Sequence, residues 1–189
     1  MRDIESQNDA RVIVISSTGK HFSAGMDLGV FSDSSTMPQS KDPSRMAESL
    51  RRLVLQLQAT LSSLEEIRLP VLTAIQGGCI GGALDLVCAA DSRYCTADAY
   101  FTIKETELGM TADVGTLQRL PKLIPAGIVK ELAFTGRKFT AQEAQQFGLV
   151  NRVYDDQESM LSGLLDTSDA ADEKRRKEKR GNRSNSKKR

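Results

Sequence analysis

Residues 71–90, VLTAIQGGCIGGALDLVCAA, contain the pattern that decides the fold. The run VLTAI is short, apolar and bounded by turn residues, which is typical of a buried strand. Gly77 and Gly78 then turn the chain, and a helix is expected from near Gly81 to about Ala90. A strand that leads into a helix through glycines favours an α/β architecture.

The segments before this stretch continue the alternation of strand and helix. The β-branched run RVIVIS at 11–16 predicts a buried strand. Between Met46 and Leu64, apolar residues recur at spacings of three and four, which predicts one long amphipathic helix that Pro70 ends. The polar loop at 29–43 separates the two elements.

The segments after it are shorter. RYCTA and YFTI resemble strands, and a loop at 104–111 leads to a helix that begins near Asp113 or Val114, where Asp113 is a candidate cap. The residues 140–143, TAQE, match a capping box and open a short helix that Gly148 closes. The run LVNRVY is a last strand-like segment, and nothing convincing follows Leu165.

Length and composition fit one globular domain. The chain has 189 residues, 39% of them hydrophobic, with no apolar run long enough to span a membrane. The N-terminal residues lack the apolar core of a secretory signal, so an intracellular location is expected.

The three cysteines have no CxxC spacing and are interpreted as reduced thiols. A single histidine, His21, excludes a Ser-His-Asp triad and makes a histidine-based metal site unexpected.

Charge is segregated along the chain. Residues 172–189 carry ten Lys and Arg against three Asp and Glu, a net charge of +7, which leaves −6 for the rest. Without aliphatic or aromatic residues such a tail cannot bury a core, so we divide the chain into a core at 1–165 and a disordered basic tail at 166–189. A solvated tail is favoured over a nucleic-acid partner because the tail has no aromatic residue for base stacking.

Three carboxylates stand out around the glycine-rich stretch. Asp85, Glu105 and Asp113 are separated by 20 and 8 residues, so no single helix face holds them. If separate elements bring them to one pocket, they suit acid/base chemistry. Taken singly, Asp113 is equally well a helix cap and Glu105 a salt-bridge partner of Lys104.

Two glycine turns suggest an oxyanion hole. Gly81 and Gly82 stand where a strand gives way to a helix, so free backbone N–H groups point outward there. If the N–H of Gly82 meets a second N–H from the turn at 24–26, ending at Met26, the pair would bind a carbonyl that becomes an enolate. Close backbone packing is the alternative explanation of the glycine pair.

At this point the motifs resemble a known family. HFSAGMDL at 21–28, the stretch 75–101 and KETELGMTADVGTLQRLPKLI at 104–124 are similar to the crotonase, or enoyl-CoA hydratase/isomerase, superfamily over roughly residues 10–155. The resemblance implies an α/β fold with a crotonase-like ββα spiral core. It also implies that the family's first strand and helix, and its C-terminal helical trimerisation module, are missing, so that the chain looks truncated at both ends.

Within the superfamily, the acids resemble those of Δ3,5-Δ2,4-dienoyl-CoA isomerases. Hydratases typically have glycine at the position of Asp113, where the isomerases have an acid. The resemblance implies that Glu105 removes a proton from C2 of a 3,5-dienoyl thioester and that Asp113 delivers one to C6. The dienolate oxygen would rest on the N–H groups of Met26 and Gly82, with Asp85 in support of the intermediate or of its neighbouring acid.

The resemblance also implies the surroundings of the site. Ala24, Asp27, Leu28 and Gly81 are expected to lie against substrate or CoA, although Asp27 on its own is interpreted as an acid that fixes a turn. No cofactor is expected beyond the CoA of the substrate. Trimers or hexamers are typical of the family, and relatives act in mitochondria or peroxisomes in fatty-acid β-oxidation, although no targeting signal is visible here. Arg119 and Lys122 are candidates for phosphate contacts, but a solvated helix face is the favoured interpretation of both.

Two other functions stay open at this stage. One is an enoyl-CoA hydratase acting across a trans-2 double bond. The other is a non-catalytic crotonase scaffold whose basic tail binds RNA.

Overall fold

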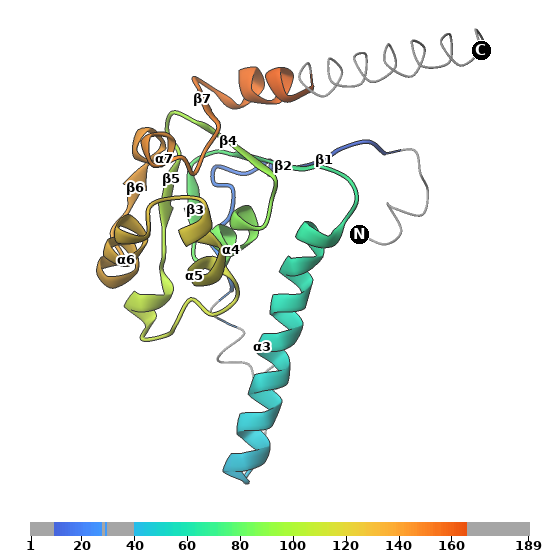
Figure 1. Cartoon of the computed structure of the whole chain (residues 1–189), viewed down its shortest axis with the longest axis vertical. Coiled ribbons are helices and arrows are strands. Elements are labelled where there is room, and N and C mark those ends of the chain that lie inside the picture. The colour runs from blue at the N-terminus through green and yellow to red at the C-terminus, as the bar shows by residue number, and fades with distance from the viewer. Residues whose placement is uncertain (1–9, 28, 30–39, 166–189) are drawn as a thin grey trace, which may run out of the picture.

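A four-stranded parallel sheet in the order β1-β2-β4-β7 forms the centre of the molecule in this computed structural model, which describes residues 10–27, 29 and 40–165 (Figure 1). Its strands are β1 (Ile13–Ile15), β2 (Val71–Ile75), β4 (Ser92–Thr96) and β7 (Arg152–Tyr154). All three pairings are parallel, as helical crossovers between the strands require. The predicted α/β class and these four strands are confirmed.

A second, smaller sheet in the order β3-β5-β6 holds the glycine-rich stretch. It consists of β3 (Gly78–Ile80), β5 (Tyr100–Thr102) and β6 (Phe139–Thr140), with β3 parallel and β6 antiparallel to β5. The predicted helix start near Gly81 is confirmed by α4 (Gly82–Cys88), but Gly77 and Gly78 do not lead directly into it, because β3 begins at Gly78 and precedes α4. Glycine has low β propensity, so pairing with neighbouring segments, and not local preference, forms this strand.

Short helical elements follow β5. They are α5 (Thr116–Arg119), α6 (Ala126–Thr135) and α7 (Ala141–Phe147), with the 3-10 turns η1 (Glu105–Leu108) and η2 (Leu120–Lys122). All of these but α7 lie between β5 and β6, and α7 connects β6 to β7 of the central sheet. The capping box that opens α7 is present, since Thr140 and Glu143 exchange hydrogen bonds, and Gly148 ends the helix in a left-handed conformation. Residues 157–165 are also helical, which the sequence pattern did not predict.

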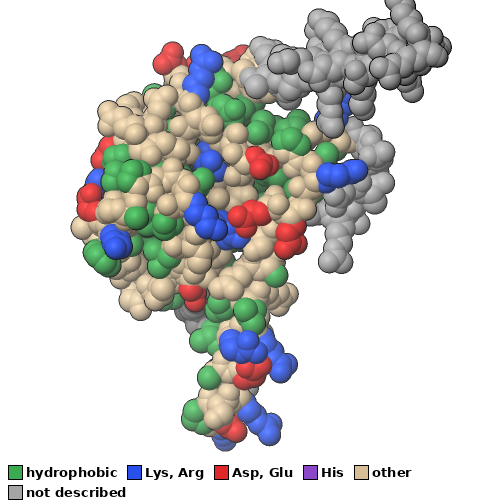
Figure 2. Space-filling model, in the orientation of Figure 1, with side chains coloured by type: hydrophobic (Ala, Val, Ile, Leu, Met, Phe, Trp, Pro, Cys, Tyr) green, Lys and Arg blue, Asp and Glu red, His purple; other side chains and the backbone are tan. Residues whose placement is uncertain are grey.

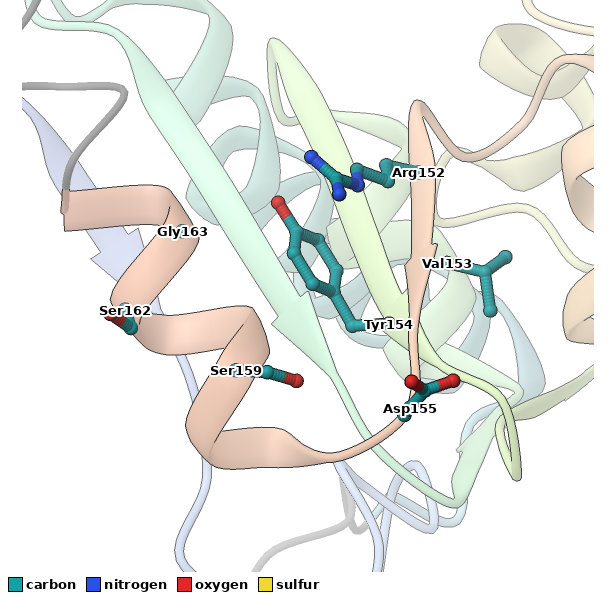
Figure 3. A pocket seen from close by; sticks show the side chains of 7 residues that line it. All are labelled: Arg152, Val153, Tyr154, Asp155, Ser159, Ser162 and Gly163. Carbon is teal, nitrogen blue, oxygen red and sulfur yellow. The ribbon is translucent and has the colours of Figure 1, made fainter.

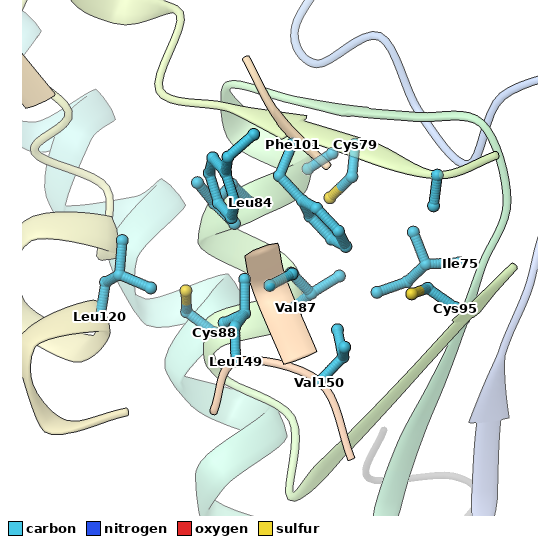
Figure 4. Close-up of a cluster of buried hydrophobic side chains, with 14 of the residues drawn as sticks. Ile75, Cys79, Leu84, Val87, Cys88, Cys95, Phe101, Leu120, Leu149 and Val150 are labelled. Atoms are coloured by element: carbon cyan, nitrogen blue, oxygen red, sulfur yellow. The ribbon is translucent and has the colours of Figure 1, made fainter. Parts of the chain in front are cut away.

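The main core lies between α4 and the two sheets (Figure 4). Leu84 and Val87 of α4 are fully buried with Ile75 of β2 and Phe101 of β5. The three cysteines are buried and free, as predicted, and fill space in this region. On the opposite face of the central sheet, Met160 and Leu164 of the helix 157–165 form a smaller cluster with Ala74 and its neighbours.

The long helix α3 (Pro43–Glu66) extends away from the rest of the molecule (Figure 1). The Asp42 carboxylate caps its first turn by accepting from Ser44 N at 2.9 Å. The helix ends at Glu66, shortly before Pro70, and Leu64 is its one buried residue. Hydrophobic side chains therefore stay at the surface of the protruding part, beside charged ones (Figure 2), and Leu50 and Leu55 are 44% and 46% exposed.

The tail at 166–189, for which a disordered state and RNA binding were considered, lies outside the described residues. In the described part of the chain, no helix combines the length and the hydrophobicity that a bilayer crossing requires.

Candidate active site

The two glycine turns meet at the start of α4. Ser23 forms a parallel bridge with Cys79 of β3, which brings the turn that ends at Met26 against the N-terminus of α4. A methyl group placed on Gly82 would lie 3.9 Å from Met26 N, and one placed on Gly25 would lie 3.5 Å from Gly82 N. The two backbone N–H groups therefore lie at one corner of the molecule.

Glycine is required at this corner. Gly25 has φ +88°, and a Cβ there would lie 2.7 Å from the carbonyl O of Ile80. Gly81 has φ +55° and ψ −120° and caps α4 without a side chain. Other residues adopt these conformations only with strain. Among the hydrogen bonds of the described residues, none has Met26 N or Gly82 N as its donor.

Glu105 lies beside this corner. It begins η1, directly after β5, and its Oε1 would be 3.2 Å from a Cβ placed on Gly81. The proposed salt bridge with Lys104 is wrong, because the Lys104 ammonium pairs with Glu107. Burial raises the pKa of the half-buried Glu105 carboxyl above its ordinary value.

Asp85 is the most deeply buried of the three acids, with 1% of its surface exposed. Its Oδ1 accepts a hydrogen bond of 2.5 Å from the N–H of Thr116, in the first turn of α5. Burial raises the pKa of Asp85, while this hydrogen bond lowers it in part. Asp85 thus performs the capping that the sequence pattern assigned to Asp113, and α5 starts later than predicted, at Thr116 after Gly115.

Asp113 lies in the irregular turn between η1 and α5, and it is half-buried. Together with six residues of α3, it lines a pocket of about 430 Å³. The wall that α3 contributes to this pocket is mainly apolar and consists of Ala47, Leu50, Arg51, Val54, Leu55 and Gln58. Asp113 therefore borders a mainly apolar surface of α3.

The three acids are close enough to act on one another electrostatically. After burial, the negative charges of Asp85 and Asp113 further raise the pKa of Glu105, and Asp113 also raises the pKa of Asp85. Separate elements deliver them, since Asp85 comes from α4, Glu105 from η1 and Asp113 from the turn before α5. That the three acids converge on one pocket stays a prediction, since Asp113 lines the pocket beside α3 and the other two acids do not.

The other predicted residues occupy the turn after Phe22. Ala24 and Asp27 are exposed beside the corner, and Leu28 lies outside the described residues. Asp27 Oδ1 accepts from Gly29 N at 2.8 Å, which is the turn-fixing role predicted for it. His21 also serves a turn, because its Nδ1 accepts from Gly78 N at 2.9 Å.

The sequence pattern missed two residues near Asp113. Arg119 was interpreted as part of a solvated face, yet its side chain is 11% exposed and pairs with Glu65. Gln58 Nε2 donates to the carbonyl O of Asp113 at 2.6 Å. A polar residue at an apolar position of the α3 stripe, four residues after Val54 and three before Leu61, was the available signal.

A second pocket, of about 460 Å³, lies away from the acids and contains none of the predicted site residues (Figure 3). It is formed by β7 and the helix 157–165, where Arg152 stacks over the ring of Tyr154. Its lining residues are Arg152, Val153, Tyr154, Asp155, Ser159, Ser162 and Gly163.

The fold is that of a known protein family, and the match to it includes the residues of the candidate site. Residues 1–175 match the family described as enoyl-CoA hydratase/isomerase, and the chain belongs to that family. This match confirms the resemblance on which the fold prediction rested.

Individual relatives are similar over most of the chain. It is 47% identical over 163 residues to the mitochondrial Δ(3,5)-Δ(2,4)-dienoyl-CoA isomerase of Mus musculus, covering 86% of this chain and 50% of the relative. It is 42% identical over 165 residues to the peroxisomal Δ(3,5)-Δ(2,4)-dienoyl-CoA isomerase of Arabidopsis thaliana, covering 87% of this chain and 59% of that protein. The chain thus spans about half the length of the curated relatives it matches.

A solved structure has the same fold. The crystal structure of an enoyl-CoA hydratase from Bacillus anthracis matches with a TM-score of 0.75 at 30% identity, covering 89% of this chain and 63% of that one. The predicted crotonase-like core is therefore confirmed.

Proposed function

We propose that the protein is an isomerase that converts a 3,5-dienoyl-CoA to the 2,4-dienoyl-CoA in fatty-acid β-oxidation. The observation that carries the proposal is that Asp113, a carboxyl group on a different segment from Glu105, lines a mainly apolar pocket. The identities of 47% and 42% to proteins named as such isomerases support it.

The reaction begins at the glycine corner. The thioester oxygen accepts hydrogen bonds from Met26 N and Gly82 N, which lie at the same glycine corner. These donors stabilise the negative charge that develops when C2 loses a proton, and removal of one such donor typically slows a reaction by about 10²–10³. Glu105, beside the same corner, takes that proton.

The second half of the reaction takes place at Asp113. The electron pair left by the C2 proton spreads over the conjugated chain, and a protonated Asp113 adds a proton at C6. The double bonds then lie at positions 2 and 4. Since Glu105 ends protonated and Asp113 ionised, each turnover closes with a proton returned to Asp113 directly or through solvent. The reaction moves protons only and needs no cofactor beyond the CoA of the substrate.

The remaining expectations follow from this assignment. Ala24, Asp27, Leu28 and Gly81 belong to the turns that would contact the CoA portion, because they border the carbonyl-binding corner. A trimeric or hexameric assembly and a mitochondrial or peroxisomal location are proposed on the basis of the family and of the two relatives' names.

Ultraviolet spectroscopy tests the proposal. Purified protein mixed with 3,5-octadienoyl-CoA is expected to produce the longer-wavelength absorbance of the conjugated 2,4-dienoyl thioester. Because proton transfer by a positioned side chain contributes about 10²–10⁴ in rate, Glu105→Gln and Asp113→Asn should each slow the reaction by that order. Glu107→Gln, in the same turn as Glu105 but paired with Lys104, is the matched control and should keep its rate.

A hydratase is the second candidate, favoured by the fold match to an enoyl-CoA hydratase. It predicts loss of absorbance from a trans-2-enoyl-CoA as water adds, with no reaction of the dienoyl substrate. A folded protein with that behaviour, or an Asp113→Asn variant as fast as the wild type, contradicts the isomerase proposal.

A further inference from the structure

Three polar residues of α3 face the segment that carries Asp113. Gln58, Ser62 and Glu65 are spaced by four and three residues, so they lie on one face of the helix. Gln58 donates to the Asp113 carbonyl at 2.6 Å, and Arg119 donates to Ser62 Oγ at 2.9 Å and to Glu65 Oε2 at 2.5 Å. These three residues form a polar seam between α3 and the segment 113–119, with Gln58 at the turn before α5 and the other two at Arg119 of α5.

The main chain at Asp113 has little other support. On the C-terminal side, the turn is anchored where Thr116 N donates to Asp85. The N–H of Asp113 itself donates to Thr111 O, within the turn. Among the described residues, Gln58 supplies the one hydrogen bond from another element that reaches the main chain of Asp113.

We propose that Gln58 is a positioning residue, which holds the Asp113 main chain so that its carboxyl group reaches the far end of the conjugated chain. The inference rests on the proposed function, in which Asp113 delivers the proton to C6. Gln58 and Asp113 line the same pocket, so the support lies next to the group that it orients. A displacement of about 1 Å at a reacting group can slow a reaction by about 10².

A comparison of the two proton transfers tests the proposal. In D₂O, Glu105 removes the C2 proton and can return a deuteron to the same carbon, so deuterium at C2 reports the first step without Asp113. Formation of the 2,4-dienoyl absorbance reports both steps. Gln58→Met keeps the length of the side chain and removes its donor, so it should slow product formation roughly tenfold to a hundredfold. Deuterium uptake at C2 should stay near the wild-type rate.

Gln56→Met is the matched control, since Gln56 is exposed on the same helix, and both rates should be unchanged. A merely structural role for Gln58 would slow the two steps together, because both depend on the folded site. Equal loss of both steps, or unchanged product formation in Gln58→Met, overturns the positioning role.

A second measurement separates this inference from the proposed function. If wild-type protein is folded but forms no 2,4-dienoyl product, the isomerase proposal fails, and hydrogen exchange followed by mass spectrometry then tests the contact itself. The segment 108–120 should exchange faster in Gln58→Met than in Gln56→Met. Equal protection in the two variants shows that Gln58 does not hold the turn and overturns the inference independently of activity.

Discussion

At the scale of single residues, the three acids differ in what surrounds them. Asp85 is enclosed and hydrogen-bonded to Thr116, Glu105 lies beside the glycine corner, and Asp113 borders an apolar pocket. All three were identified from the sequence as candidates. The cap of α5 was assigned to Asp113 and is supplied by Asp85, because the start of α5 depends on the contact between Asp85 and Thr116, which no local pattern reveals. The surroundings of Glu105 and of Asp85 each lead to a testable expectation.

Ionisation of Glu105 should link activity and stability in opposite directions. In the proposed mechanism Glu105 acts as a base and must be ionised. Because burial and nearby acids raise its pKa, kcat/KM should rise with pH at higher pH values than those at which a glutamate ordinarily ionises. A carboxyl with a raised pKa in the folded state stabilises the protein below its unfolded pKa, and this stability is lost as the pH rises through the folded pKa. Glu105→Gln should therefore unfold at a higher temperature than the wild type at neutral pH.

Thermal unfolding at several pH values checks this expectation. The difference in Tm between Glu105→Gln and the wild type should shrink on acidification, where both side chains are neutral. A Tm difference that is constant with pH would show that packing, and not ionisation, causes it.

Two substitutions of Asp85 separate its capping role from its charge. Asp85→Asn keeps an oxygen that can accept from Thr116 N, whereas Asp85→Ala leaves that buried N–H without its partner. Loss of a buried hydrogen-bond partner costs about 1–3 kcal/mol, so the alanine variant should unfold at lower urea and the asparagine variant should not. Because Asp85 raises the pKa of Glu105, Asp85→Asn should also move the rise of kcat/KM to lower pH.

Urea titrations and pH–rate profiles of both variants measure these effects. Equal destabilisation by Asn and Ala would argue against the cap. An unmoved pH profile in the asparagine variant would show that the charge of Asp85 does not reach Glu105.

At the scale of elements, long periodic or well-capped segments were predictable and short ones were not. The stripe of α3 and the capping box of α7 are local patterns, and the structure confirms both. The strand β3 was missed because glycines have low strand propensity, and the two-residue strand β6 is too short for any periodicity. These elements exist because neighbouring segments pair with them.

The capping box offers a direct test at this scale. Thr140 Oγ1 accepts from Glu143 N at 3.2 Å, and Glu143 Oε2 accepts from Thr140 N at 2.9 Å. Thr140→Ala removes one of these bonds and should lower the free energy of unfolding by about 1 kcal/mol. Thr140→Ser retains the hydroxyl and should remain close to the wild type in urea unfolding. If the serine variant loses as much as the alanine variant, packing of the threonine methyl group accounts for the effect.

At the scale of the whole molecule, the candidate site forms beside the two sheets, on three connecting segments: α4, η1 and the turn before α5. The central sheet is covered on one face by α4 and on the other by the helix 157–165, two segments far apart in the sequence. The positions of its four strands along the chain followed from sequence patterns, but their order in the sheet, the second sheet and the position of α3 did not, because they depend on contacts between distant segments. The long helix reaches the site through side chains near its anchored end, at Gln58, Ser62 and Glu65.

The corner formed by Gly25, Gly81 and Gly82 has an evolutionary consequence. Its two donors belong to the main chain, so a codon change in the surrounding residues alters side chains and leaves the donors in place. The acids, in contrast, each depend on one codon, and an aspartate is a single nucleotide change from glycine, asparagine or glutamate. In the proposed mechanism, a lineage with this fold can therefore keep its main-chain donors to the thioester oxygen while it exchanges the proton carriers around them.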